Sequence, residues 1–376
     1  GAPEGIKGIS LFVVPKYLVN EDGSLGERNT MQCGGLEEKM GIHGNATCVM
    51  NYDDAKGWLV GEEHKGMRTM FVMMNEARLG VGLQGLAQAD IAYQNAADFA
   101  RDRLQSRSLT GPAAPEKPAD PIIVHPDVRR MLMDSRAFIE GARAFILWTA
   151  LYGDLEHKSP DEKVREKASD YMALMTPVLK GFLTDHGFKT TSECLQLHGG
   201  IGYTEEMGVE QYMRDARIAL IYEGTNGIQA LDLVGRKLAA NGGRAIFTFF
   251  GEIDDFIGEN SDNDDLKFAL EPLKDIREKL QEGTMWLMQN GMANFNNAGA
   301  ASTDYMHLFG YTALAYMWAM MSKTALEKKD GSDPFYENKL ITARYYMERI
   351  LPRGGAHLSS LKTGADNMMA LEAEAF

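Results

Sequence analysis

A glutamate at a sharp turn is the side chain in this sequence best placed to act as a base. Glu223 follows an apolar stretch and precedes Gly224, where the backbone can turn sharply. Thr225 or Asn226 can then cap a helix that begins near Gly227. At such a corner, facing an apolar cavity, desolvation would raise the pKa of the carboxyl group and make it a stronger base. The alternative is a glutamate that ends a helix in water, and spacing alone favours that alternative.

A glutamine followed by paired glycines forms a second candidate site. Gln196 precedes Gly199 and Gly200 in the run QLHGGIG. Glycines after a helix let backbone N–H groups approach a ligand closely, and a glutamine side chain can hydrogen-bond the edge of a ring. A helix end followed by an ordinary turn explains the same residues. Arg103, expected within a helix, is a candidate for binding a phosphate, although a solvated arginine is the commoner case.

The elements that must position these candidates are predicted to be mostly helices. Residues 1–60 have the pattern of β-structure, and a helical pattern starts near residue 66. Its first helix runs through Leu83 and Leu104, and a loop with five prolines at 112–126 follows. Apolar residues at helical spacing then predict further helices, the first two packed in a bundle. These helices are expected over residues 128–149, 164–182, 266–290, 304–328 and 335–351.

Composition excludes several classes of protein. The 376 residues carry a formal net charge of −14, and so acidic a surface disfavours nucleic-acid binding. The three cysteines have no metal-ligand spacing, so no metal site is expected, and their use suits a reducing cytoplasm. The stretch Tyr305–Ser322 carries no Asp, Glu, Lys or Arg, but its histidine, glycine and tyrosines favour a buried helix over a membrane span.

Six segments together resemble the acyl-CoA dehydrogenase family in their order and spacing. The two most specific are QLHGGIG at 196–202 and IYEGTNGIQ at 221–229, the latter preceded by RDAR. The other four lie at residues 5–15, 38–47, 60–67 and 74–79. The resemblance implies a mainly α fold with a partial β-domain at the N-terminus. It assigns residues 1–65 to the rest of a middle β-domain, 66–242 to a C-terminal helical bundle with the catalytic base, and 243–376 to the helical C-terminal extension of the larger members.

The resemblance implies a flavoenzyme that forms an α,β-double bond in an acyl-CoA thioester. Glu223 would remove the α-proton while a hydride passes from the β-carbon to FAD. The backbone N–H of Glu223 would hydrogen-bond the enolate oxygen as charge develops there. The electrons would pass to an acceptor such as an electron-transfer flavoprotein.

The resemblance also implies roles for individual residues and an assembly. The positions that match the family's FAD-binding residues are Arg103, Gln196, Gly199, Gly200, Thr225 and Gly227, and those that match its substrate-contacting residues are Asn75, Arg78 and Gly224. Arg103 would bind the flavin phosphate. Gln196, Gly199 and Gly200 would hold the adenine half of a neighbouring subunit's flavin. A homodimer or a dimer of dimers is therefore implied.

Three departures from the family pattern indicate a divergent branch. The pair Ser106-Arg107 replaces the Phe-Gly that usually follows the flavin arginine, the loop 112–126 is longer than usual, and His43 stands where many members carry Arg. The family's N-terminal helical domain would precede residue 1, so we expect this chain to be part of a longer protein and to hold flavin poorly by itself. The extension would cover the adenine end of CoA or, as the simpler interpretation, pack against another subunit.

Two other functions remain open at this point. An acyl-CoA oxidase would use the same base with oxygen as the electron acceptor, and residue spacing cannot separate the two enzymes. A catalytically idle flavoprotein that binds nucleic acid would need a basic face on the extension. The acidic runs at 252–255 and 262–265 argue against that second alternative.

Overall fold

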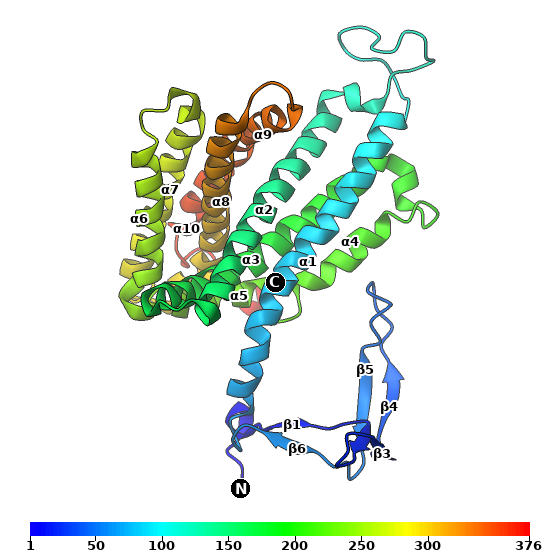
Figure 1. The fold of residues 1–376 in the computed structure, drawn as a ribbon, viewed down its shortest axis with the longest axis vertical. Helices are drawn as coiled ribbons and strands as arrows, with labels where there is room; N and C mark the ends of the chain where they lie inside the picture. Colours follow the sequence, from blue (N-terminus) through cyan, green and yellow to red (C-terminus); the bar gives the residue numbers. More distant parts are fainter. The chain divides into compact units, whose positions relative to one another are not determined.

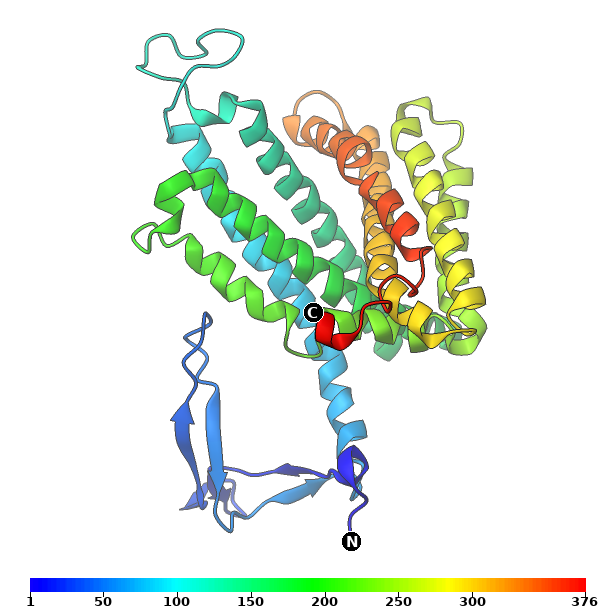
Figure 2. The same cartoon turned by 180° about the vertical axis from the view of Figure 1, so that it is seen from behind.

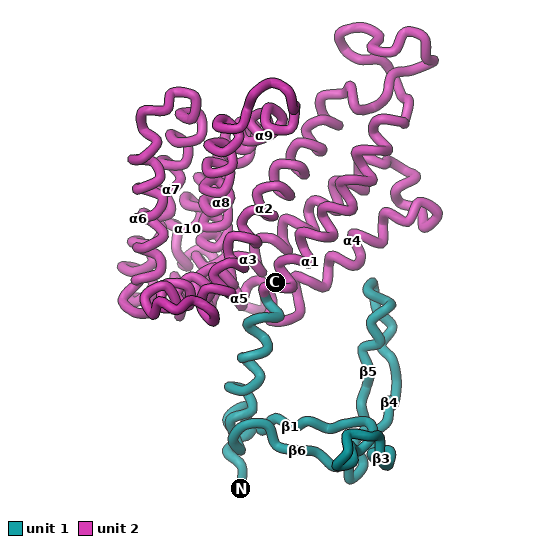
Figure 3. The backbone as a smooth tube through the Cα atoms, viewed as in Figure 1, with its two compact units in different colours: residues 1–78 teal, residues 79–376 magenta.

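A computed structural model describes residues 1–376 and divides them into two compact units. The first unit comprises residues 1–78 and the second comprises residues 79–376 (Figure 3). Helix α1 (Gly66–Asp102) begins in the first unit and ends in the second. The predicted mainly helical fold with a partial β-domain at the N-terminus is confirmed. The three-part division at residues 65 and 242 stays a prediction.

The first unit contains three separate pairs of antiparallel strands (Figure 1). The pairs are β1 (Leu11–Val13) with β6 (Trp58–Val60), β2 (Tyr17–Val19) with β3 (Leu25–Arg28), and β4 (Met31–Leu36) with β5 (Cys48–Tyr52). Buried Asn29 joins two loops of this unit, since its Nδ2 donates to Pro15 O at 3.0 Å and to Lys56 O at 2.7 Å. The β-structure expected over residues 1–60 is thus present as short paired strands.

The regular secondary structure of the second unit consists of helices, apart from one isolated bridge between Leu104 and Pro121. Its bundle contains the end of α1 together with α2 (Pro126–Lys158), α3 (Glu162–His198), α4 (Glu210–Arg217) and α5 (Asn226–Asp232). The extension contains α6 (Arg244–Glu259), α7 (Lys267–Asn290), α8 (Phe295–Lys328), α9 (Pro334–Tyr345) and α10 (Arg353–Leu361). Helix α8 lies along α2 and α3, so the extension packs directly on the bundle (Figures 1 and 2).

The bundle and the extension share one hydrophobic core. Phe145 and Phe182 of the bundle belong to the same buried cluster as Phe249 and Phe309 of the extension. The rings of Phe249 and Phe309 are stacked with their centroids 5.3 Å apart. The stretch Tyr305–Ser322 lies inside α8 and is almost wholly buried, which confirms the buried helix. None of the helices is both long and apolar enough to cross a membrane.

Glycines let the helices of the second unit approach closely. A Cβ on Gly187 of α3 would overlap the carbonyl oxygen of Gly85 on α1, so these two helices meet backbone to backbone. A Cβ on Gly181 would overlap the side chain of Met306, and a Cβ on Gly310 would overlap the ring of Phe182. Close packing of this kind leaves no room for even one methyl group.

Three details of the helix assignment were wrong. Helices α6 and α10 were not predicted, and α8 begins at Phe295, nine residues before the expected start at 304. Arg103 lies just outside α1, which ends at Asp102, because the chain there leaves the helix to form the bridge at Leu104. The apolar residues keep their helical spacing as far as Leu104, so periodicity alone predicted an end of the helix that lies too late in the chain.

The proline loop that follows α1 is organised around one buried carboxylate. Asp120 accepts hydrogen bonds from the backbone N–H groups of Ser108 at 2.8 Å and Ala114 at 2.8 Å. Its partner Arg107 binds the same carboxylate at 3.1 Å and donates to Ala114 O at 2.9 Å. These backbone hydrogen bonds, with Arg107, hold the pKa of Asp120 well below its usual range. Arg107, which departs from the family pattern, thus has a structural role in this loop.

We predict that Asp120→Asn loosens the loop between residues 106 and 120. Amide hydrogen exchange at Ser108 and Ala114 should be faster in the variant at pH 7, because the charged acceptor is lost. The folded pKa is lowered, so the stabilisation is present above the ordinary value of about 3.8 and is lost on acidification below it. The two proteins should therefore become alike at strongly acidic pH, whereas the exposed Asp102→Asn should resemble the parent throughout. Equal exchange at pH 7 would contradict the assignment.

We predict that Gly187→Ala destabilises the second unit by about 1–3 kcal/mol, because its Cβ would meet backbone that cannot move aside. Gly251→Ala, inside α6 with nothing within 4 Å of the new Cβ, is the matched control. It should stabilise the helix by about 0.5–1 kcal/mol, since alanine favours helix over glycine. Urea unfolding of both variants measures the free energies, and a neutral Gly187→Ala would refute the close crossing.

Candidate active site

The turn that carries Glu223 connects α4 to α5 through a short 3-10 segment, Ile218–Leu220. Glu223 and Gly224 both have positive φ, 57° and 87°, so the chain reverses within two residues. A left-handed conformation costs a non-glycine residue free energy and persists only where its surroundings impose it. Thr225 then caps α5, its side chain accepting from Ile228 N at 3.4 Å. The helix begins at Asn226, one residue before the expected start.

A buried lysine holds this turn from inside the bundle. Lys180 of α3 is fully buried, and its Nζ donates to Gly224 O at 2.8 Å and to Asn226 Oδ1 at 2.7 Å. Gln229 of α5 is also fully buried, and its Nε2 donates to Glu223 O at 3.2 Å and Gly224 O at 3.1 Å. The two carbonyl groups of the strained turn are therefore fixed by two side chains that have no access to water.

Asn226 joins the turn to α3. Its Nδ2 donates to Asp185 Oδ1 at 2.7 Å and Thr184 Oγ1 at 2.9 Å, and reaches Gly181 O at 3.2 Å. Beside the turn, the hydroxyl group of Tyr222 donates to Gln84 Oε1 on α1. The turn is thereby attached to two long helices of the bundle.

The Glu223 side chain is only half-buried, unlike the groups that hold its backbone. A partly exposed carboxylate on a fixed backbone can accept a proton from a molecule placed before it. The geometry thus supports the chemistry expected of Glu223, while its identity as a base stays a prediction.

The paired glycines occupy the other end of α3. The helix ends at His198, and Gly199 follows with a φ of 64°. Nothing lies within 4 Å of a Cβ built on Gly199 or Gly200, and Gln196 is exposed beside them. His198 is turned inward, with Nδ1 at 2.7 Å from Cys194 O, and burial lowers its pKa. The open surface thus consists of glycine backbone and the glutamine amide.

Arg103 lies at the same end of the bundle as the glycines. A small apolar cluster there contains Ala100 of α1, Ile122, and Leu197 of α3. Arg103 follows α1 directly, and its carbonyl group accepts from Ile122 N at 2.8 Å. The guanidinium side chain is exposed. This end of the bundle therefore gathers a cation, a glutamine amide and two exposed glycines, of which Gly199 caps α3 by donating its backbone N–H to Gln196 O.

The structure separates the predicted site residues into two groups. Glu223, Thr225 and Gly227 lie beside Lys180, whereas Gln196 comes sixteen residues later on α3. At 1.5 Å per residue, that separation is about 24 Å along the helix axis. One chain therefore does not bring the turn at Glu223 and the paired glycines together.

Asn75 and Arg78 belong to the part of α1 that lies in the first unit. Asn75 is exposed, and Arg78 is buried with its guanidinium group 5.7 Å from the ring centroid of Phe71. Their contact with a substrate stays a prediction, as does that of Gly224.

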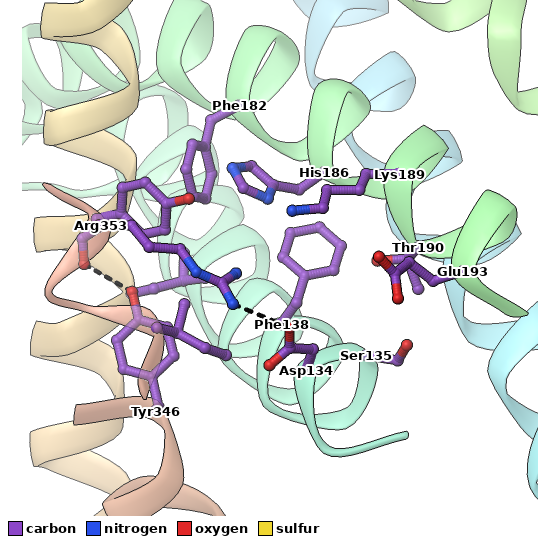
Figure 4. A pocket seen from close by; sticks show the side chains of 13 residues that line it. Asp134, Ser135, Phe138, Phe182, His186, Lys189, Thr190, Glu193, Tyr346 and Arg353 are labelled. Atoms are coloured by element: carbon purple, nitrogen blue, oxygen red, sulfur yellow. Dashed lines mark hydrogen bonds and ion pairs between the residues drawn. The ribbon is translucent and has the colours of Figure 1, made fainter. Parts of the chain in front are cut away.

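The second unit also contains a pocket (Figure 4). It lies between the bundle helices α2 and α3 and the extension, where Arg353 of α10 reaches Asp134 of α2 at 2.9 Å. Phe138, Phe182 and His186 form its inner wall, and burial holds the pKa of His186 well below its usual range. No residue predicted for the active site lines this pocket.

Two family models match most of the chain. The model described as "Acyl-CoA dehydrogenase, C-terminal domain" matches residues 64–238, and the one described as "Acetyl-CoA dehydrogenase C-terminal like" matches residues 249–372. The chain belongs to the acyl-CoA dehydrogenase family. The predicted membership is confirmed, and the enzymes of this family are FAD-dependent.

Two curated relatives match the whole chain. A 3-methylmercaptopropionyl-CoA dehydrogenase of Ruegeria pomeroyi is 41% identical over 98% of this chain and 62% of the relative. A broad-specificity linear acyl-CoA dehydrogenase of Mycobacterium tuberculosis is 33% identical over 100% of this chain and 64% of the relative. The chain thus spans less than two thirds of the length of these relatives.

Solved structures share the fold at lower sequence identity. ACDH-11 of Caenorhabditis elegans in complex with C11-CoA has a TM-score of 0.75 and 20% identity, over 93% of this chain and 55% of that one. An acyl-CoA dehydrogenase of Bacillus anthracis complexed with FAD has a TM-score of 0.72 and 19% identity, over 88% of this chain and 56% of that one. Both likenesses include the extension, which is therefore part of a known architecture.

The residues present fit FAD at the end of α3. The glycine backbone at 199–200 has open space before it, and an exposed glutamine amide and an exposed arginine lie at the same end of the bundle. Such groups suit a phosphate and the polar edge of an adenine ring.

Sequence reasoning missed the residues that hold the turn, Lys180 and Gln229. Lys180 interrupts the apolar face of α3 between Val178 and Phe182, and a lysine at a core position is a signal of a buried partner. Gln229 was within a recognised motif but received no role. The contact of Lys180 with the turn could not be inferred without the fold, because Lys180 lies 44 residues before Gly224.

We predict that Lys180→Met destabilises the protein by about 1–3 kcal/mol, because the carbonyl of Gly224 and the amide of Asn226 lose a buried donor. Lys163→Met, on the exposed start of the same helix, should change the stability by less than about 0.5 kcal/mol. Urea unfolding measures both values. Equal stability of the two variants would mean that the hydrogen bonds of Lys180 contribute nothing to folding.

Proposed function

We propose that this chain carries the catalytic base of an FAD-dependent acyl-CoA dehydrogenase, and that Glu223 is that base. The observation that carries the proposal is the strained turn at Glu223 and Gly224, which is fixed through both of its carbonyl groups by Lys180 and Gln229. Strain maintained by buried hydrogen bonds is typical of functional sites. A glutamate needed only to end a helix would not require such support.

The chain's own groups act on the thioester in this proposal. The half-buried carboxylate of Glu223 accepts the proton from the α-carbon, and the backbone N–H of Glu223 donates to the thioester oxygen as negative charge develops there. When bound, FAD supplies the acceptor for the hydride that leaves the β-carbon. The fixed turn keeps the carboxylate oriented, so little reorganisation is needed at the moment of proton transfer.

The flavin site is proposed to be shared between two copies of the chain. Thr225 and Gly227 would hold the flavin beside the base, and Arg103 would bind its phosphate. Gln196, Gly199 and Gly200 would hold the adenine half of the flavin of a neighbouring subunit. The separation of about 24 Å along α3 supports this arrangement, because one chain does not bring the two groups together. A homodimer or a dimer of dimers follows from it. The three scattered cysteines support a reducing cytoplasm as the proposed location.

The proposed substrate is an acyl-CoA thioester, with 3-methylmercaptopropionyl-CoA as the first candidate. The name of the relative with 41% identity supports that choice, and the relative with 33% identity supports a linear acyl-CoA as the alternative. Asn75, Arg78 and Gly224 are the proposed substrate contacts. An electron-transfer flavoprotein is the proposed acceptor, and an acyl-CoA oxidase is the alternative with the same base.

We predict that Glu223→Gln abolishes reduction of bound FAD by acyl-CoA in the complete gene product. Glutamine keeps the size and the backbone of the turn but cannot take up the α-proton at pH 7. An anaerobic titration with 3-methylmercaptopropionyl-CoA and linear acyl-CoAs, followed by flavin absorbance, measures the reduction. The flavin of the parent protein should lose its absorbance near one equivalent of acyl-CoA. The variant should bind FAD, and its flavin should stay oxidised.

The exposed Glu205→Gln, in the loop before α4, is a matched control that should bleach like the parent. Bleaching of Glu223→Gln would show that the base lies elsewhere. A parent protein that binds FAD but stays oxidised with every acyl-CoA would refute the dehydrogenase proposal and favour the idle flavoprotein.

A further inference from the structure

The polar groups behind the catalytic turn continue into the extension. Asp185 of α3 uses both of its carboxylate oxygens: Oδ1 accepts from Asn226 Nδ2 at 2.7 Å, and Oδ2 lies 3.1 Å from His307 Nε2 on α8. Since Asn226 also accepts from Lys180, a short hydrogen-bonded chain runs from the turn to the extension. It contains two side chains, Asn226 and Asp185, between Lys180 and His307.

His307 is held firmly in place on the extension side. Its ring stacks on that of His357 of α10, with centroids 5.1 Å apart and planes 12° apart. His357 Nδ1 in turn lies 2.7 Å from Asp304 Oδ1. The ring of Phe182 meets His307 edge-on at 5.7 Å. Only 14% of the His307 side chain is exposed.

Apolar packing at the same place joins the turn to α8. Helix α5, which begins directly after the turn, packs against both α3 and α8. Met306, the neighbour of His307, fills the space before Gly181, and Gly181 O accepts from Asn226 Nδ2. The extension therefore touches the helix that follows the base as well as the residues that hold the turn.

We propose that His307 is a positioning residue for Glu223, acting through Asp185 and Asn226, so that the extension takes part in organising the active site. The proposal rests on the function proposed above. With its Oδ2 bound by His307, the Asp185 carboxylate keeps one orientation and presents Oδ1 to Asn226. Without that bond the carboxylate can rotate, Asn226 loses a fixed acceptor, and the turn it belongs to loses a restraint.

The expected effect lies on the rate of the chemical step. A small displacement of a base can lower the rate many-fold, while substrate binding by other groups is unchanged. We therefore expect His307→Phe, which keeps an aromatic ring but has no donor, to lower kcat about tenfold with KM nearly unchanged. His307→Gln keeps an N–H donor and should recover most of the loss.

The simpler interpretation is that His307 and Asp185 merely attach the extension to the bundle. The ion pair between Lys339 of α9 and Glu140 of α2, at 2.6 Å, is an attachment of that kind with no route to the turn. Lys339→Met is thus the matched control: it removes one contact between the bundle and the extension and should leave kcat unchanged.

The experiment measures kcat and KM for reduction of bound FAD, with urea unfolding, in the complete gene product and its variants. A double-mutant cycle between His307→Phe and Asp185→Asn measures the coupling of these two residues in their effect on kcat. The loss in kcat for the double variant should be no larger than the larger of the two single losses, because both substitutions remove the interaction between His307 and Asp185.

Loss of kcat in His307→Phe, recovery in His307→Gln, and an unchanged Lys339→Met are the results we expect. Equal effects of His307→Phe and Lys339→Met, or an unchanged kcat in His307→Phe, would overturn the proposal. So would a change in KM alone. If Glu223→Gln itself still reduces flavin, the proposed base has failed. If Glu223→Gln is inactive while His307→Phe is normal, only the role of His307 has failed.

Discussion

The hydrogen bonds from Lys180 to Gly224 and Asn226 are the interaction on which the turn that carries Glu223 depends. A lysine amino group removed from water is costly unless acceptors surround it, and here the acceptors are a backbone carbonyl and an amide of the turn. The strained turn in turn needs the lysine, since positive φ at a glutamate is unfavourable by itself. Each therefore stabilises the other.

Glycines on α3 let the neighbouring helices pack closely around the buried lysine. Lys180 and Gly181 are neighbours on α3, and the glycine lets α8 approach while the lysine points to the turn. Further along α3, Gly187 lets α1 approach, and α1 also supplies Gln84 to Tyr222. The same helix thus meets the extension, the turn at Glu223 and the first bundle helix, so the geometry of this turn depends on packing over the length of α3.

Sequence reasoning could predict the parts of this protein that depend on local patterns. The turn at Gly224, the cap by Thr225 and the end of α3 before Gly199 follow from residue types over a few positions, and the resemblance assigned roles to them. Long-range partners such as Lys180 with Gly224, or Asp185 with His307, depend on how helices pack, and no spacing along the chain encodes them. Helix α6 was not predicted, although its buried residues Ile246, Phe249, Phe250 and Ile253 follow helical spacing.

The shared core between the bundle and the extension limits how members of this family can exchange parts. Gly141 faces the indole of Trp318, and Gly310 faces the ring of Phe182, so each large side chain on one side requires a glycine on the other. An extension grafted from another member would present different large residues to these glycines and leave either overlap or cavities. An exchange of extensions would succeed only if both residues of each pair were exchanged at the same time. Among homologues, a substitution at one residue of a pair should therefore be accompanied by a substitution at the other.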